Sequence, residues 1–325
     1  MYYCRSIAVL LAGLALWPAA SQAQTYPARP VRIVVALLPG GGNDTVARLA
    51  AAKMSVTLKQ QVVVENRAGA GGLIGADYVA KSAPDGYTLL LGNVATMAII
   101  PNMQKNPPYD PRKDFEPISL IASAPLLVVV HPSLPVHDIR GLIALSKARP
   151  AELNYASNGV GSTTHLATEL YLMMSGTRML HVPYKGLSAA MTDLMSGQMQ
   201  VMFSSAVAML PHVKQGRLRA IAMTGAQRSP VIPDIPTVAE AGVPGYEAGS
   251  WYGLLAPAGT PRAIVDLLSE HVAAAAKTDD IVKHLSADAV VPIGSTPDAF
   301  RAHIAKEYER MRSVVQKSMA AKGAQ

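Results

Sequence analysis

The chain has 325 residues; half of them are apolar, 16% are charged, and 29 Lys and Arg against 22 Asp and Glu give a net charge of +7. This composition excludes an intrinsically disordered chain, which would carry fewer apolar and more charged residues. The single cysteine excludes a scaffold held by disulfides within the chain. Aromatic residues make up only 5%, which argues against a binding surface built on stacked aromatics. The length favours two domains.

The first 23 residues have the three-part pattern of a secretory signal. Arg5 precedes the unbroken apolar run Ile7–Trp17, and Pro18–Ala23 then supplies a helix breaker and small residues before Gln24. The apolar run is well short of the roughly 20 residues that span a bilayer. Residues 1–23 are therefore predicted to be a cleaved signal peptide, and the mature chain is predicted to be periplasmic.

The mature chain alternates predicted strands with predicted helices. Apolar runs rich in β-branched residues predict strands, and apolar residues at helical spacing after a capping residue predict helices. Strands are predicted at Val31–Leu38, Gln61–Glu65, Tyr87–Gly92, Ile118–His131, Leu153–Ser157, Arg178–Val182, Gln200–Ser204, Leu218–Thr224 and Glu247–Ala256, with a short one near Val290–Ile293. Helices are predicted from a cap at Asn43 or Asp44 to about Leu58, after Gly75 to about Lys81, at Ile139–Ala148, after Ser162 to about Ser175, and over most of the chain after 256. Pro101–Pro117 and Ser229–Gly245 are predicted to be irregular. This alternation is typical of βαβ units and a largely parallel sheet.

The order of these elements predicts one domain inserted into another. The alternating pattern starts afresh after the extended segment 118–131, and a second extended segment, 247–256, follows the new α/β unit. We therefore expect a discontinuous lobe 1 formed by 24–124 and 251–325. Lobe 2, residues 125–250, is expected to be inserted into it.

Two glycine-rich loops between a strand and a helix are the main candidate binding sites. In Leu38–Asp44 the glycines let backbone N–H groups point into one hollow at the positive end of the helix dipole, which is a ready anion site. Ser157–Thr164 repeats this geometry and adds hydroxyl groups. The alternatives are a plain strand–helix turn in the first loop and hydroxyls that only cap the next helix in the second. Because each loop would open one lobe toward a shared cleft, the pair favours ligand binding between the lobes.

Two further loops give weaker signals. Gly69–Gly75 follows a strand, but the third glycine of a dinucleotide fingerprint would fall at position 74, which is Ile74. Asn93 and Thr96 follow another strand and are placed to reach a ligand, with simple turn chemistry as the alternative.

The sequence lacks the common motifs of catalysis and metal binding. It contains no GxxxxGK[ST] phosphate loop and no HExxH or other metal-ligand spacing among its eight histidines. It has no GxSxG elbow either, because Gly161-Ser162 is followed by Thr163, and His165 lies three residues after Ser162, which is helix spacing. Lys and Arg are scattered along the sequence, which argues against a nucleic-acid-binding surface. We expect no cofactor, no metal and no nucleic-acid partner.

Several stretches carry a recognisable family pattern. The longest are VVALLPGGGNDTVARLAA (Val34–Ala51), VVVENRAGAGGLIGADYVA (Val62–Ala80), NYASNGVGSTTHLATEL (Asn154–Leu170) and SWYGLLAPAGTP (Ser250–Pro261). Together with shorter stretches between them, they resemble the periplasmic receptors of tripartite tricarboxylate transporters, the Bug-type solute-binding proteins. The resemblance covers essentially the whole mature chain in order.

The resemblance implies a type II periplasmic-binding-protein fold. In this fold two α/β lobes, joined by two crossing strands, close on a ligand in the manner of a Venus flytrap. The resemblance also implies a small organic carboxylate as ligand, held by backbone amides and hydroxyls of the two loops. The implied contacts are Leu37, Gly40, Gly41, Asn43 and Asp44 in the first loop and Ser157, Asn158, Gly161, Ser162 and Thr163 in the second. Asn93, Thr96 and Ser204 complete the candidate set.

Three departures from the family pattern bear on the ligand. The first loop of the family reads Pro-Phe-Pro where this chain has Ala36-Leu37-Leu38, so an aromatic wall of the pocket is missing or the pocket is wider. Ser204 stands where many relatives carry Asp, which removes a counter-charge for an ammonium group and argues against an amino acid. Met97 stands where relatives often have His.

The sequence therefore predicts a monomeric, non-enzymatic receptor. It is expected to capture a small organic acid by hinge closure and to deliver it to the membrane subunits of a tripartite-type transporter. A periplasmic ligand-sensing adaptor for a signalling system is an alternative, and a serine hydrolase using Ser162 and His165 is another.

Overall fold

The structure is a computed structural model that describes residues 26–40, 42–287 and 289–323. The predicted signal peptide, residues 1–23, and the candidate site residue Gly41 lie outside the described residues. Within the described part, strands and helices alternate as the sequence predicts. They build two sheets that share one long strand, β4 (Phe115–Val130).

The first sheet combines strands from both ends of the chain. Its order is β2-β1-β3-β9-β4-β10, with β1 parallel to β2 and β3 and with β9 antiparallel to β3 and β4. Alternate side chains of β1 enter opposite cores: Ile33 packs with helices α1, α8 and α9, and Val34 packs with α2. The bounds are β1 Val31–Val35, β2 Val62–Asn66, β3 Thr88–Asn93, β9 Gly249–Pro257, β10 Val291–Pro292, α1 Gly42–Thr57, α2 Leu73–Ala80, α8 Arg262–Ala276 and α9 Asp279–Ala287.

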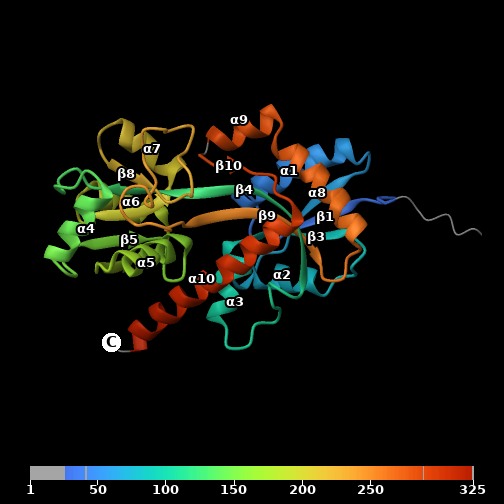
Figure 1. The fold of residues 1–325 in the computed structure, drawn as a ribbon, viewed down its shortest axis with the longest axis horizontal. Coiled ribbons are helices and arrows are strands. Elements are labelled where there is room, and N and C mark those ends of the chain that lie inside the picture. Colours follow the sequence, from blue (N-terminus) through green and yellow to red (C-terminus); the bar gives the residue numbers. More distant parts are fainter. Residues whose placement is uncertain (1–25, 41, 288, 324–325) are drawn as a thin grey trace, which may run out of the picture.

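The second sheet is built from one continuous stretch of chain. Strands β5, β6 and β7 are parallel neighbours, and the second half of β4 runs antiparallel between β7 and β8. Val128 packs on the side of α4 and α5, whereas Leu127 and Val129 pack on the side of α6 and α7. The bounds are β5 Asn154–Ser157, β6 Leu180–Pro183, β7 Val201–Ser205, β8 Arg219–Met223, α4 Ile139–Ala148, α5 Thr163–Ser175, α6 Leu187–Met195 and α7 Ala206–Lys214. The two sheets with their helices form two α/β lobes (Figure 1).

The chain crosses between the lobes at two places that lie side by side. In the first crossing, β4 changes partners: it pairs with β9 up to Pro125 and with β7 and β8 from Leu126 onward. In the second crossing, the chain passes from Ala248 into β9. Thr224, which directly follows β8, is bonded to both crossings, because its hydroxyl accepts the N–H of Leu126 at 2.6 Å and donates to the carbonyl of Ala248 at 2.7 Å. These bonds hold the two crossings together at the point where a hinge would turn.

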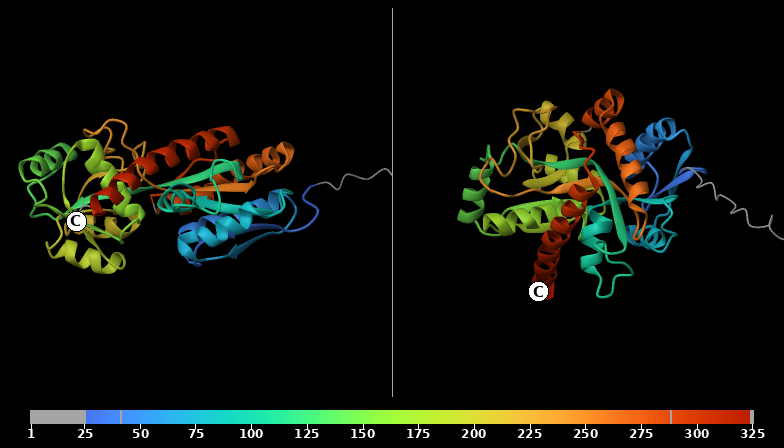
Figure 2. Two further views of the ribbon diagram at one scale, coloured as in Figure 1. Left: turned by 90° about the horizontal axis from the view of Figure 1, so that it is seen from below. Right: turned by 45° about the vertical axis from the view of Figure 1, so that its right-hand side comes forward.

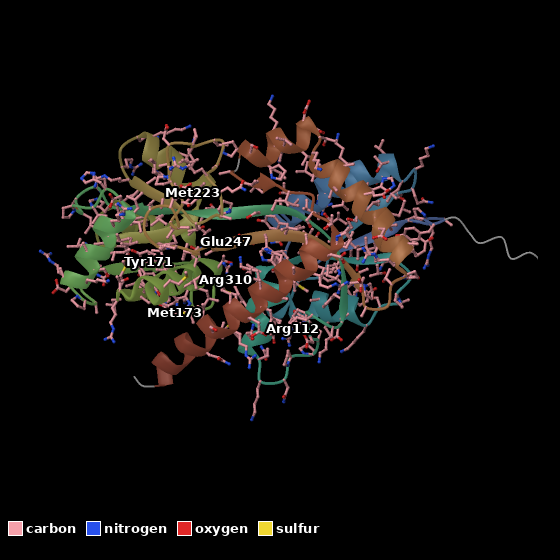
Figure 3. The ribbon with its side chains drawn as sticks, in the orientation of Figure 1. Arg112, Tyr171, Met173, Met223, Glu247 and Arg310 are labelled. Atoms are coloured by element: carbon pink, nitrogen blue, oxygen red, sulfur yellow. The ribbon has the colours of Figure 1, made fainter. Side chains whose placement is uncertain are left out.

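The C-terminal helix α10 (Pro297–Gly323) packs on both lobes. It contacts β4 and the π-helical turn η2 (Ala95–Ile99) of the first lobe and α5 of the second. Figures 1 and 2 show it running from one lobe to the other, and Figure 3 shows Arg310 near the middle of the molecule, where α10 crosses it. At its start, Phe300 is fully buried, and a Cβ at Gly253 of β9 would lie only 2.1 Å from its ring.

The structure differs from the sequence prediction in a few elements. The first strand ends at Val35 and not at Leu38, because its register with β2 and β3 stops there. A short helix, α3 (Ile100–Met103), extends into the segment predicted to be irregular, since Pro101 occupies its first turn, where a missing N–H costs nothing. Helices α6 and α7 were not predicted; small residues weaken the periodicity of α6, and Pro211 interrupts that of α7.

Candidate functional site

The first candidate loop lies between β1 and α1 and is organised by the carboxylate of Asp44. Its Oδ2 accepts the N–H of Gly40 at 3.1 Å and the Nε–H of Arg48 at 3.0 Å, and its Oδ1 accepts from Asn66 at 3.0 Å. The hydrogen bond from Arg48 is the largest influence that lowers the pKa of Asp44 to about 2, assisted by those from Gly40 and Asn66. The buried carboxylate is therefore ionised at neutral pH, and it joins the loop at Gly40 to α1 at Arg48 and to the end of β2 at Asn66.

Asn43 and Asn93 connect this loop to the next strand of the sheet. The side-chain amide of Asn93 donates to Oδ1 of Asn43 at 2.6 Å. Asn93 and Thr96 also cap each other, because each backbone N–H donates to the side-chain oxygen of the other residue, at 3.1 and 3.0 Å. The turn chemistry weighed for Asn93 and Thr96 is thus present, and Asn93 additionally orients Asn43.

Tyr252 is a member of this site that the sequence reasoning missed. It lies opposite Asn93 where β9 pairs with β3, and a Cβ on Gly42 would be only 2.6 Å from its hydroxyl oxygen. The phenol group therefore lies against the first turn of α1, where backbone N–H groups have no acceptor within the helix. Only the pairing of β9 with β3, two strands far apart in the sequence, brings it there.

The glycine-rich loop Gly69–Gly75 lies beside the first candidate loop, Leu38–Asp44. An open, largely apolar hollow runs between them, lined by Leu37, Leu38, Pro39, Ala68, Gly69, Gly71 and Gly72. The glycines serve close packing: Gly72 has φ +110°, and a Cβ there would lie 2.7 Å from Cγ2 of Thr96. Leu38 is 73% exposed at the edge of this hollow.

In the second lobe, the candidate loop between β5 and α5 is closed by its own hydroxyl groups. Ser162 is the N-cap of α5: its Oγ accepts the N–H of His165 at 3.2 Å and donates to the carbonyl of Gly159 at 2.7 Å. The hydroxyl of Thr164 accepts the N–H of Asn158 at 3.0 Å. Ser162 therefore caps α5, whereas the hydroxyl of Thr164 closes the loop at Asn158, and Thr163 is the first residue of α5.

The remaining contacts of this loop involve two histidines. The N–H of Gly161 donates to Nδ1 of His165 at 3.1 Å, and the buried hydroxyl of Ser157 lies 2.7 Å from Nε2 of His181. Gly161 also faces the first lobe, because a Cβ on it would lie 3.1 Å from Cε of Met103 at the end of α3. The described contacts of Ser162 and His165 have the geometry of a helix cap.

Ser204 lies near the carboxyl end of β7, and the parallel register of β7 with β5 (Met202 opposite Ala156) puts it at the same sheet edge as the second-lobe loop. Ser204 is 1% exposed and pairs with Leu127 of β4, whereas the next residue, Ser205, is exposed and is the N-cap of α7. A contact between Ser204 and a ligand stays a prediction.

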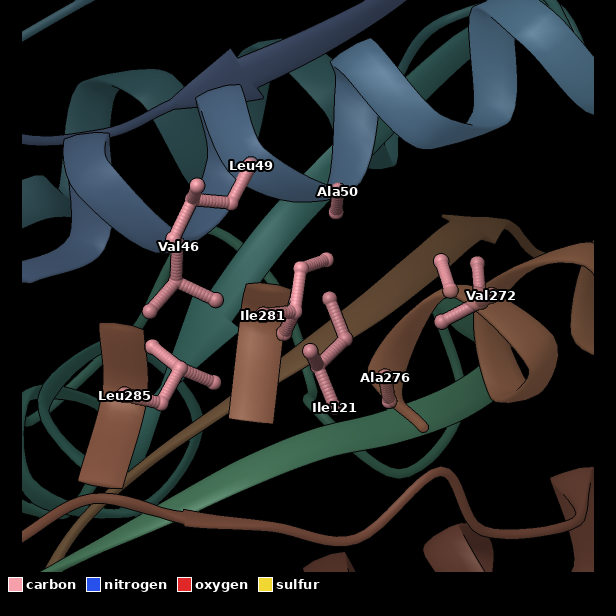
Figure 4. A pocket seen from close by; sticks show the side chains of 9 residues that line it. Val46, Leu49, Ala50, Ile121, Val272, Ala276, Ile281 and Leu285 are labelled. Carbon is pink, nitrogen blue, oxygen red and sulfur yellow. The ribbon is translucent and has the colours of Figure 1, made fainter. Parts of the chain in front are cut away.

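Other features of the described residues do not compete with these loops. No group of three or more His, Cys, Asp or Glu in the described ranges is arranged to hold a metal ion. None of the helices that the structure describes has the length and apolar character needed to cross a membrane. A small gap between α1, α8, α9 and β4 is lined only by apolar side chains (Figure 4) and offers no side-chain partner to a polar ligand.

The chain is similar to a family of known receptors. The family model described as tripartite tricarboxylate transporter family receptor matches residues 46–319. Protein BugT of Bordetella pertussis is 40% identical over 315 residues, which cover 97% of this chain and 96% of BugT. The structure of R. palustris Rpa4515 with adipate is similar, with 39% identity, a TM-score of 0.72, and coverage of 90% of this chain and 97% of that chain. MatC (Rpa3494) from Rhodopseudomonas palustris with bound malate has 34% identity, a TM-score of 0.69, and coverage of 89% and 100%. The predicted family resemblance and the two-lobed fold class are confirmed.

Proposed function

The chain belongs to the tripartite tricarboxylate transporter receptor family of periplasmic solute-binding proteins, and we propose that it captures a small organic carboxylate between its two lobes. The observation that carries the proposal is the pair of loops at the starts of α1 and α5. Each loop ends at a helix N-terminus, where unpaired N–H groups and the helix dipole favour an anion. Similar proteins are described with adipate and with malate, both dicarboxylates, which supports this ligand class.

In the first lobe, one carboxylate of the ligand docks on the first turn of α1. The donors there are the backbone N–H groups of that turn and the NH2 group of Asn43, whose oxygen is occupied by Asn93. The hydroxyl of Tyr252 lies at the same turn. The negative charge of Asp44 does not oppose docking strongly, because Arg48 neutralises it.

In the second lobe, the start of α5 closes over the ligand. The N–H groups of Asn158 and Gly161 are used within the loop, so the first turn of α5 at Thr163 supplies the donors. Closure turns the lobes about the two crossings at 124–126 and 248–249, and the ligand stabilises the closed arrangement by its higher affinity for it. We place lobe 1 at 24–124 and 251–325 and lobe 2 at 125–250.

The donor set favours a ligand that is an acid without an ammonium group. Asp44 is the only charged side chain in the candidate set, and Arg48 and Asn66 already bond to it. Ser204, in place of an aspartate, gives an ammonium group no counter-charge. Exported by the segment 1–23, the receptor acts in the periplasm as a monomer and delivers the acid to the membrane subunits of a tripartite-type transporter.

A thermal-shift screen of the mature chain, residues 24–325, tests the ligand class. The panel contains adipate, malate, citrate, benzoate and glutamate. A ligand that binds only the folded state raises the midpoint of unfolding by mass action, so we expect a concentration-dependent increase with at least one of the carboxylates and none with glutamate. No shift with any carboxylate, or a shift with glutamate alone, would contradict the proposal. Small-angle X-ray scattering of the same samples then checks closure, which reduces the radius of gyration.

A further inference from the structure

Behind the second-lobe loop lies a stacked row of three rings, Tyr155, His181 and His165. The rings of Tyr155 and His181 are 4.8 Å apart and inclined by 16°, and those of His181 and His165 are 4.1 Å apart and inclined by 22°. They come from β5, β6 and α5. Tyr155 and His165 are buried, with 0% and 2% exposed. Two of the three rings are therefore interior groups of the lobe, and the third, His181, is partly buried between them.

The two histidines of the row contact the second-lobe loop near its first residue and near its last. At the start, Nε2 of His181 is 2.7 Å from the hydroxyl of Ser157, which also accepts the N–H of Gly159 at 3.2 Å. At the end, Nδ1 of His165 accepts the N–H of Gly161 at 3.1 Å. The loop backbone is thus held by this row of rings at Ser157 and at Gly161.

The contact with Gly161 defines the state of the imidazole. A ring nitrogen that accepts a hydrogen bond carries no proton, so His165 is neutral and its proton is on Nε2. That nitrogen faces Glu169, whose Oε1 is 4.0 Å away and also accepts the hydroxyl of Tyr155. Glu169 therefore favours the proton on Nε2, and Nδ1 is the nitrogen that accepts the N–H of Gly161.

The contact with Gly161 matters because of the place of this residue in the loop. Gly161 has φ +79°, in the left-handed region, directly before the N-cap Ser162. An N–H group that loses its acceptor in a partly buried place costs free energy, so the loop would shift to regain a partner. Such a shift would move the first turn of α5, which begins two residues later.

We propose that His165 is a positioning residue for ligand capture. Through Nδ1 it holds Gly161 so that the N–H groups at the start of α5 face the cleft, and His181 supports it by stacking and by its contact with Ser157. This proposal rests on the proposed function, since it assigns to His165 the arrangement of the second-lobe half of that site. His165 itself lies behind the loop.

Two substitutions separate the hydrogen bond from the packing of the ring. His165→Asn places an amide oxygen at the position of Nδ1 and keeps the acceptor, whereas His165→Leu has a similar shape without one. Both remove the stacking on His181 equally, so the difference between them reports on the contact with Gly161.

The first readout needs no ligand. Long-range ¹H–¹⁵N spectra of the wild type should show an unprotonated Nδ1 and a protonated Nε2 on His165. Amide hydrogen exchange at Gly161 should be about tenfold faster or more in His165→Leu and near the wild-type rate in His165→Asn. A protonated Nδ1 in the wild type, or equal exchange in the two variants, would overturn the proposal.

The second readout is affinity for adipate by calorimetry. Loss of one such hydrogen bond should weaken adipate binding about tenfold in His165→Leu, and His165→Asn should recover most of that loss. Equal affinity of the two variants would mean that the ring acts only by packing. If the wild type does not bind adipate, that acid fails as the proposed ligand, and the exchange and ring-nitrogen data still decide the role of His165.

Discussion

The side chain of Asn93 donates a 2.6 Å hydrogen bond to Oδ1 of Asn43, which ties the end of β3 to the first turn of α1. Because the bond uses the amide oxygen of Asn43, its NH2 group is the part that is left to donate outward. The buried Asn93 thus orients Asn43 so that a ligand would meet its NH2 group and not its oxygen.

Asn43→Asp should abolish most carboxylate binding while leaving the fold intact. The new carboxylate keeps the acceptor for Asn93 but replaces the NH2 donor with a negative charge. Like charges in a partly buried site repel, so we expect affinity for the cognate acid to fall by about tenfold or more, equivalent to about 1.4 kcal/mol. Calorimetry measures this, with the exposed Asn106→Asp as a control for the added charge. Equal affinity in both variants would remove Asn43 from the site.

Asp44→Asn should lower stability at neutral pH and flatten its dependence on acid. The pKa of Asp44 is lowered from 3.8 to about 2, so ionisation of this carboxyl stabilises the folded state relative to the unfolded state. This stabilisation is complete above pH 3.8 and is lost as the pH falls toward 2. Its size is about 2 kcal/mol. In urea unfolding, the difference in unfolding free energy between wild type and variant should be smaller at pH 3 than at pH 7.

The matched control for Asp44 is Asp266→Asn. Asp266 has the same kind of partner, Arg262, four residues away at 2.8 Å, but both side chains are about half exposed. Exposed pairs of this kind contribute about 0.5 kcal/mol or less. If Asp266→Asn lowers the unfolding free energy as much as Asp44→Asn does, burial is not the reason for the contribution of Asp44 to stability.

Ser162→Ala should lower the stability of the second lobe and also lower the affinity for the ligand. Removing this N-cap costs about 1 kcal/mol of unfolding free energy and loosens the first turn of α5. Asp138→Ala removes the N-cap of α4 in the same lobe, where Oδ1 accepts the N–H of Gly141 at 2.7 Å. We expect similar losses of stability from the two variants, measured by urea unfolding, and a loss of affinity only from Ser162→Ala. Unchanged affinity there would leave Ser162 with capping alone.

Gly253→Ala should be strongly destabilising, because its Cβ would lie 2.1 Å from the ring of Phe300. Overpacking of a buried ring costs about 1–3 kcal/mol, and here it separates α10 from β9. Combining it with Phe300→Leu should give a double variant more stable than the sum of the single losses predicts. Additive losses in thermal unfolding would show that the two residues do not compete for the same space.

The sequence was informative wherever a pattern is local. Periodicity and glycine punctuation predicted the strands that carry the site, and α4 was predicted with the bounds that the structure has. The N-cap role of Ser162 was weighed from the residues alone, since the serine directly precedes a helical pattern. The two crossings were expected from two extended segments that enclose a separate α/β unit.

What the sequence did not show depends on contacts between distant segments. The direction of the Asp44 carboxylate is decided partly by Asn66, at the end of another strand. Tyr252 reaches α1 only because β9 returns to pair with β3, and His181 meets His165 only because β6 lies beside β5. No spacing rule in a single sequence reports on such pairings.

The placement of β9 between β3 and β4 also sets an order of folding. The second lobe is one uninterrupted stretch, whereas the first sheet closes only when a strand from the last quarter of the chain inserts between two earlier ones. Closing such a long loop is entropically costly and slow, and until then both neighbours expose unpaired edges that favour aggregation. A strand that is synthesised after both of its neighbours therefore protects the edges that β3 and β4 leave open.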